Sequence, residues 1–123
     1  MFYEQDWIMQ QIQMLVQFIA RTVFKKDTIS YEIIDETNLS EADLLYKRLK
    51  SLIAERRICD AENLLFENIH EDNTEYLEVA LDFYQTINLM TDDVLEAHNF
   101  SRQEIDDGMH EIMRKYHISE LEI

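Results

Sequence analysis

Two pairs of side chains have the spacing that metal ligands show on helices. An acidic residue is followed three positions later by a histidine at Glu67 and His70, and again at Asp107 and His110. In helical bundles that hold two metal ions, two of the helices each supply a carboxylate and a histidine at this spacing. One interpretation of the chain is therefore a metal-dependent enzyme that uses these two acid-x-x-His pairs.

Helical geometry argues against such a metal site. At roughly 100° per residue, Asp107 lies roughly 160° and His110 roughly 100° around the helix from Met109, the centre of the local apolar stripe. The first pair lies similarly far from the apolar stripe of its own helix. Since 26 of the 123 residues are acidic, the spacing also arises readily by chance. We therefore expect solvated side chains here, with no catalytic residue, no metal ligand and no cofactor, in a chain that is not an enzyme.

The glycine and cysteine content excludes several further kinds of functional site. Gly108 is the only glycine and there is no proline, which excludes glycine-rich phosphate-binding loops and the sharp turn around a nucleophilic serine. Gly108 falls within an expected helix, where it would allow another helix to approach closely. Cys59 is the only cysteine, so no disulfide can form within the chain, and we expect it to be a small core residue.

Apolar side chains recur at helical spacing along nearly the whole chain, and no segment is predicted as a strand. Capping residues with hydrophobic staples predict helix starts at Ser30, Ser40, Thr91 and Ser101. The expected helices span about residues 4–24, 30–35, 40–56, 60–71, 74–89, 91–97 and 101–116. Short connections make successive long helices antiparallel. We predict an all-α fold of antiparallel helical hairpins packed as a bundle, in a single helical domain over residues 1–123.

The clearest of these hairpins lies between residues 40 and 71. Its second helix carries a small residue, Ala61, with Leu65 and Ile69 at the apolar positions beyond it. In this the segment resembles a tetratricopeptide hairpin. Leu49 stands where that family has a small residue in the first helix, and no second copy appears at the repeat spacing of about 34 residues. The resemblance implies tetratricopeptide-like packing rather than an array of repeats.

Four stretches spread over nearly the whole chain carry a second resemblance. They are Glu4 to Met9, Ala61 to Glu67, Tyr76 to Leu81, and Phe100 to Ile105. On these stretches the chain resembles an uncharacterised bacterial family of short, acidic, all-helical proteins, a domain of unknown function. The resemblance implies a fold related to tetratricopeptide hairpins, and it implies no activity and no site residue.

Negative charge is concentrated in one half of the chain. Residues 1–57 hold nine acidic and eight basic side chains, whereas residues 58–113 hold fifteen acidic side chains and one basic one. Such a field repels nucleic acid and anionic membranes. Two functions are compatible with this charge. One is an acidic surface that binds a basic partner, with Glu75, Glu78 and Asp82 as candidate residues. The other is an acidic mimic of nucleic acid that binds a basic protein. The simpler explanation is solubility.

The start of the chain carries no sign of targeting. The longest uncharged run, residues 7–20, includes four glutamines and is too short and polar to span a membrane. Glu4 and Asp6 stand where a secretory signal would have basic residues. We therefore expect a cytoplasmic protein that binds neither membrane nor nucleic acid.

The first expected helix has two apolar stripes. The main stripe, which we expect to face the core, comprises Ile8, Ile12, Leu15, Val16, Ile19 and Val23. Trp7, Met14 and Phe18 form a second stripe, about 120° to 160° around the helix from Ile12. A helix that is apolar on two sides is either central in its bundle or covered by something else. We therefore predict a protein-interaction or self-associating module that uses Trp7, Met14 and Phe18 to bind a protein partner or to form a homodimer. The alternative is that the last helix covers this stripe.

Overall fold

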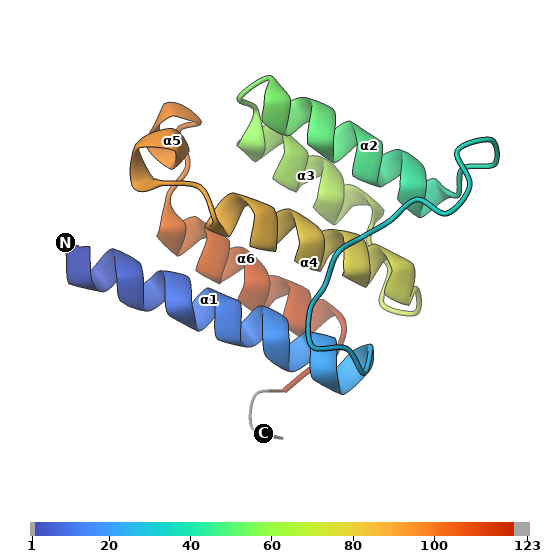
Figure 1. The fold of residues 1–123 in the computed structure, drawn as a ribbon, viewed down its shortest axis with the longest axis horizontal. Coiled ribbons are helices and arrows are strands. Elements are labelled where there is room, and N and C mark those ends of the chain that lie inside the picture. The colour runs from blue at the N-terminus through green and yellow to red at the C-terminus, as the bar shows by residue number, and fades with distance from the viewer. Residues whose placement is uncertain (1, 120–123) are drawn as a thin grey trace.

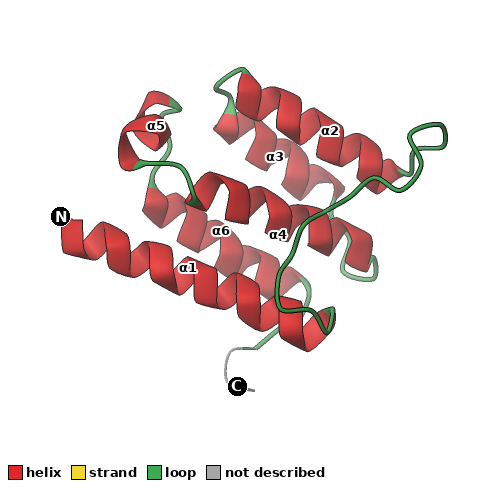
Figure 2. Ribbon diagram, viewed as in Figure 1, coloured by secondary structure: helices red, strands yellow, loops and turns green. Residues whose placement is uncertain are grey.

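The computed structural model describes residues 2–119, which form six helices (Figure 1). Their bounds are Phe2–Val23 for α1, Glu41–Ala54 for α2, Ile58–Asn68 for α3, Thr74–Asn88 for α4, Asp92–Ala97 for α5 and Arg102–Lys115 for α6. Within this range there is no strand (Figure 2). The predicted all-α fold is therefore confirmed. None of the helices in this part of the chain is long and apolar enough to cross a membrane.

The central helix of the bundle is α4. It packs against α1, α2 and α6, and Figure 1 shows it between α1 and the pair formed by α2 and α3. Ten of its fifteen residues are buried, and they lie on all sides of the helix. A helix that is buried all round belongs at the centre of a bundle. The first helix, in contrast, lies along one edge.

The predicted core faces are largely confirmed. On α1, the four central members of the main stripe, Ile12, Leu15, Val16 and Ile19, are at most 7% exposed. The segments α2 and α3 pack against each other as the predicted hairpin (Figure 1). Its apolar positions at Leu49, Ala61, Leu65 and Ile69 are all buried.

Capping boxes begin α2 and α6, at two of the predicted helix starts. The Ser40 hydroxyl accepts a hydrogen bond from the backbone N–H of Asp43 at 3.1 Å, and the Asp43 carboxylate accepts one from the N–H of Ser40 at 3.0 Å. Ser101 and Glu104 repeat this arrangement at 3.1 and 2.7 Å. Thr91 caps α5 through its side chain alone. These bonds satisfy N–H groups that have no partner inside the helix.

The helix predicted over residues 30–35 is wrong, because this segment forms an extended strap across α4 (Figure 1). Ile29 and Tyr31 are buried, and the residues next to them are exposed. The N–H of Tyr31 donates to the carboxylate of Asp82 at 2.9 Å, and the Gln85 amide donates to the carbonyl of Ile29 at 2.8 Å. Side chains of α4 thus bind the backbone on both sides of Ser30 and hold this segment extended.

Four of the helices between residues 2 and 119 end in the left-handed conformation without a glycine. The residues that adopt it, each with a φ of 57° to 60°, are Lys25, Arg56, Asn99 and His117. After α2 the N–H of Arg57 donates to the carbonyl of Leu52 at 2.8 Å, which is the closing bond of a Schellman motif. A left-handed residue other than glycine costs roughly 1 kcal/mol. Of the four residues, only Asn99 is of a type that favours this conformation, so the sequence does not mark the other three helix ends.

Candidate interaction surface

The outer face of α1 carries large apolar side chains that the bundle leaves in water. Trp7 is 60% exposed, Met14 is 68% exposed, and Phe18 is half-buried against the core. The last helix, α6, packs against α1 but does not cover Trp7 or Met14. We call Trp7, Gln11, Met14, Phe18 and Arg21 the α1 seam, because they recur at alternating spacings of four and three residues along one side of the helix.

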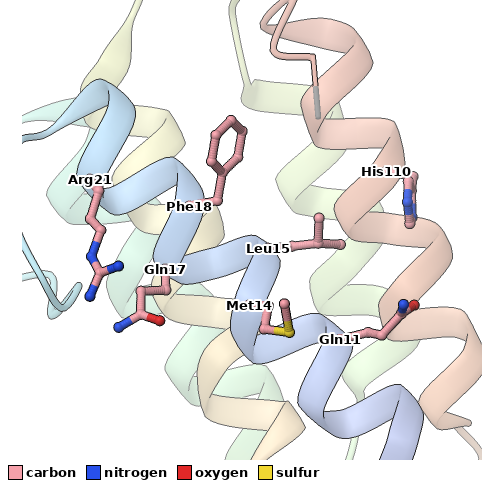
Figure 3. A pocket seen from close by; sticks show the side chains of 7 residues that line it. All are labelled: Gln11, Met14, Leu15, Gln17, Phe18, Arg21 and His110. Carbon is pink, nitrogen blue, oxygen red and sulfur yellow. The ribbon is translucent and has the colours of Figure 1, made fainter. Parts of the chain in front are cut away.

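A groove of about 310 Å³ lies along the α1 seam (Figure 3). It is lined by Gln11, Met14, Leu15, Gln17, Phe18 and Arg21 of α1 and by His110 of α6. In Figure 3, Leu15 points toward α6, whereas Gln17 and Arg21 lie on the side of α1 away from it. No carboxylate and no serine, threonine, cysteine or lysine is among these seven lining residues. The groove can therefore hold an apolar side chain, with amide and guanidinium groups at its rim.

The α1 side of the groove is weakly charged. The sequence has no acidic residue between Trp7 and Lys26, although the net charge of the chain is −15. The Arg21 guanidinium lies 3.4 Å from the Asp27 carboxylate, with both side chains exposed, and such a pair contributes at most about 1 kcal/mol. On the α6 side, the imidazole of His110 lies 2.9 Å from the backbone carbonyl of Asp106 and 3.6 Å from its carboxylate. The α1 side of the groove therefore offers little attraction to a strongly ionic ligand, and the charged groups beside it are already paired.

The two acid-x-x-His pairs do not come together. Glu67 is exposed near the end of α3, and His70 lies in the following loop, where its ring packs against Tyr76 at a centroid distance of 5.9 Å. Asp107 is exposed on α6, whereas His110 lines the groove. Among residues 2–119, no group of three or more His, Cys, Asp or Glu side chains is placed to hold a metal ion.

Of the three candidate acidic residues, Glu75 is exposed, the Glu78 side chain is only 19% exposed, and Asp82 is buried. Glu78 pairs with Lys26 at 3.4 Å. Asp82 is only 8% exposed, and its carboxylate accepts the backbone N–H of Tyr31. The prediction that Asp82 belongs to a binding surface is wrong, because this side chain anchors the strap to α4.

A comparison with protein families identifies the relatives of the chain. The model of a family of unknown function, DUF6483, matches residues 2–117. The chain belongs to this family. The resemblance to a domain of unknown function is thereby confirmed, and membership of DUF6483 brings no activity, ligand or site residue with it. No curated protein and no solved structure matches the chain, so the site of this DUF6483 member has to be inferred from its own residues.

Cys59 is exposed at the start of α3, so the prediction that it is a small core residue is wrong. The residue before it, Ile58, occupies the buried position instead. Partial burial raises the pKa of the Cys59 thiol, and the carboxylates of Glu104 and Glu62 raise it further. A raised pKa disfavours the thiolate, which is the nucleophilic form. Cys59 therefore lacks the electrostatic surroundings of a catalytic cysteine.

A buried hydroxyl and a half-buried carboxylate meet beside Gly108. The hydroxyl of Tyr84, a fully buried residue, donates to the Glu62 carboxylate at 2.6 Å. A Cβ on Gly108 would overlap the Tyr84 hydroxyl and lie 2.7 Å from Oε2 of Glu62, so the glycine allows the close approach that was predicted. Burial raises the pKa of Glu62, the hydrogen bond from Tyr84 lowers it, and the carboxylates of Glu104 and Asp107 raise it. The sequence did not reveal this cluster, because its members are far apart in the chain.

We expect Glu62→Gln to stabilise the protein at neutral pH and to lose this advantage in acid. A carboxyl whose pKa is higher in the folded protein than in the unfolded chain binds its proton more tightly when folded. Its ionised form therefore reduces stability above the folded pKa, and this reduction disappears below the unfolded pKa of about 4.3. Glutamine stays neutral, and its side-chain oxygen still accepts from Tyr84.

Thermal unfolding at pH 7 and at pH 4 measures this effect. The melting temperature of the Glu62→Gln variant should exceed that of the natural protein at pH 7, and the two values should converge at pH 4. Glu67→Gln, at an exposed position of the same helix, is the matched control. A Glu62→Gln variant that is less stable than the natural protein at pH 7 would contradict this reasoning.

Arg102, the only basic residue between positions 58 and 113, is buried. Its guanidinium donates to the carbonyl of Asn88, to the carbonyl of Met90 at 2.9 Å, and to the Asp92 carboxylate at 2.7 Å. The Asn88 side-chain amide donates in turn to the carbonyl of Met9 at 3.1 Å. This network joins the start of α6 to the end of α4, to α5 and to α1. Sequence reasoning counted Arg102 only as a charge and missed its structural role.

Proposed function

We propose that the chain is a non-catalytic protein-interaction module whose contact surface is the α1 seam. The observation that carries this proposal is the exposure of Trp7 and Met14, two large apolar side chains on one face of a helix whose opposite face is buried. Contiguous exposed apolar side chains are typical of interaction sites. Aromatic residues and methionine are also enriched in the cores of protein interfaces.

The occupant that we propose is a protein segment with an apolar and weakly charged face. The net charge of −15 disfavours nucleic acid and anionic membranes, and no carboxylate lines the groove to attract a cationic ligand. The groove also lacks a nucleophile with a neighbouring base, which supports a non-catalytic role. The proposal assigns the chain to the cytoplasm, where an exposed lone thiol such as that of Cys59 remains reduced.

A photo-reactive amino acid in place of Met14 tests this proposal in living cells. Illumination should give covalent protein adducts from position 14, because the proposed partner covers this side chain. The matched control is the same substitution at Leu89, which is 63% exposed at the end of α4. The adducts are expected from position 14 and not from position 89. If position 14 gives no adduct, or only those that position 89 gives, the proposal is refuted.

A further inference from the structure

We infer that the groove along α1 is filled by Trp7 of a second copy of this chain, in an antiparallel dimer of α1 helices. The inference rests on the proposed function and names its partner. Trp7 protrudes from the first part of the α1 seam, and the groove surrounds Phe18 in its second part. Because Trp7 and the groove lie on the same face of one helix, Trp7 cannot reach the groove of its own chain. It can fill only the groove of a second copy.

Four residues that line the groove have the spacing of a hole that receives one side chain from a facing helix. In paired helices each protruding residue enters a hole formed by four residues of the facing helix. Met14, Gln17, Phe18 and Arg21 stand at the corresponding spacing of three, one and three residues, and all four line the groove. The Arg21 guanidinium at the rim is available to stack on an indole ring that enters. The hole is therefore suited to a large aromatic side chain.

Only an antiparallel arrangement places Trp7 opposite Phe18 in both halves of a symmetric dimer. The two-fold axis then passes between Gln11 and Met14, and the interface is closed and self-complementary. In a parallel pair, Arg21 would lie beside the partner's Arg21, and the two guanidinium groups would repel each other. Lys25 and Lys26 would repel the same lysines of the second copy. The antiparallel pair separates the two Arg21 side chains by roughly 25 Å along the helices.

The α1 seam is the place where two copies of this acidic chain can approach each other with the least repulsion. Two chains that each carry a net charge of −15 repel each other, and they do so least across residues 7–26, which include no acidic side chain. The polar residues along the groove, Gln11 and Gln17, have amides that both donate and accept hydrogen bonds and so pair with their own kind. The contact covers only about 17 Å of helix. An interface of this size is small, so we expect a dimer that dissociates on dilution.

Disulfide trapping tests the arrangement. All variants carry Cys59→Ser, a change at an exposed position, so the introduced thiol is the only one. A mixture of Trp7→Cys and Phe18→Cys chains should cross-link at least about tenfold faster than either variant alone, because the dimer raises the effective concentration of facing thiols. Position 7 lies roughly 16 Å along the helix from the partner's position 7, too far for a disulfide. The mixed dimer keeps one Trp7 and Phe18 pair, and Leu89→Cys gives the background rate.

The outcomes of the trapping separate the dimer from the proposed function. Rapid cross-linking of Trp7→Cys by itself would indicate a parallel pair and overturn the inference. Cross-linking at the Leu89→Cys rate in every sample would also overturn it. In that case adducts between position 14 and a different protein in cells would leave the proposed function standing, whereas the absence of such adducts would remove both.

The fluorescence of Trp7 provides a second measurement that leaves the α1 seam intact. Because Trp7 is the only tryptophan, its emission reports on this site alone. As the protein is concentrated, the emission should shift to shorter wavelength and quenching by acrylamide should fall several-fold, since the indole leaves water. Met14→Glu should abolish both changes and Leu89→Glu should not. If the emission is independent of protein concentration, the inference is overturned. Because this measurement uses the natural side chains, it decides the question also when the cysteine variants fail to associate.

Discussion

We expect Arg102→Met to lower the free energy of unfolding by roughly 3 kcal/mol, a larger loss than most single substitutions cause. The Arg102 side chain is 4% exposed and donates to two backbone carbonyls and to the Asp92 carboxylate. Methionine fills a similar volume but leaves the carbonyls of Asn88 and Met90 without these donors. Because half of the Asp92 side chain is exposed, water can replace the lost ion pair there. The cost therefore comes mainly from the buried carbonyls.

Chemical denaturation measures this loss, and a fall in melting temperature of roughly 10 °C should accompany it. Arg102→Lys should recover less than half of the loss, because one ammonium group cannot reach acceptors that a planar guanidinium binds together. The matched control is Arg114→Met on the same helix, where the side chain is 68% exposed and pairs with Glu111. This control should change the stability by less than about 0.5 kcal/mol. Equal effects at positions 102 and 114 would show that the buried network contributes nothing.

The second large effect is expected from Gly108→Ala, which should destabilise the protein although alanine favours helices. The added Cβ would overlap the Tyr84 hydroxyl, lie 2.6 Å from Cζ of that ring, and lie 2.7 Å from Oε2 of Glu62. Tyr84 is fully buried in the core, so it can move away from the added Cβ only if the side chains packed around it also shift. Overpacking of this kind costs about 1–3 kcal/mol, and the gain in helix propensity offsets about 1 kcal/mol of it.

A double-mutant cycle with Tyr84→Phe tests the cause of this loss. Removing the hydroxyl should be less harmful in the Gly108→Ala background than in the natural protein, with a coupling above about 0.5 kcal/mol. Asp107→Ala, at the exposed neighbouring position, is the control for helix propensity, and it also removes the hydrogen bond that Asp107 accepts from Gln103. If Gly108→Ala raises the stability, the close contact between α4 and α6 at this position is refuted.

Local signals in the sequence were sufficient for most of the fold. Ser40 and Ser101 begin their helices as predicted, because the hydrogen bonds of their capping boxes involve residues only three positions apart. The apolar stripes centred on Ile12 and Met109 likewise predicted buried faces of α1 and α6. In both cases the evidence lies within one segment of the chain: a hydrogen bond between near neighbours, or the periodic spacing of apolar residues along one helix.

The errors arise where partners distant in sequence decide the structure. Ser30 has the local signature of a helix start, but Asp82 and Gln85 bind the backbone around it and hold it extended. Asp82 was assigned to the surface for the same reason, since its partner Tyr31 is far away in the sequence. Arg102 is buried only because the ends of α4 and α5 bring their carbonyls to it. Single-sequence periodicity contains none of these contacts.

The candidate site was predictable in part. The helical projection of α1 located Trp7, Met14 and Phe18 on a second apolar face, and the structure leaves the first two exposed. The groove could not be predicted, because it depends on how α6 lies beside α1 and places His110 at its edge. Phe18 is packed partly against the core, so Phe18→Cys chains used for disulfide trapping have to keep the helical circular dichroism of the natural protein, whereas Met14 is exposed. Met14 is therefore the better position for a test.

Sedimentation equilibrium over a wide range of protein concentrations tests the contact between copies most directly. The natural chain should change from a molar mass of 14.8 kDa at low concentration toward twice that value at high concentration. Met14→Glu should keep the mass of one chain throughout, because each dimer would bury two unpaired charges, while its helical circular dichroism stays unchanged. Leu89→Glu, an equally exposed apolar-to-acidic change, should associate like the natural chain. A natural chain that keeps the mass of one copy at every concentration, or a Met14→Glu variant that associates as strongly, would contradict a dimer formed through the α1 seam.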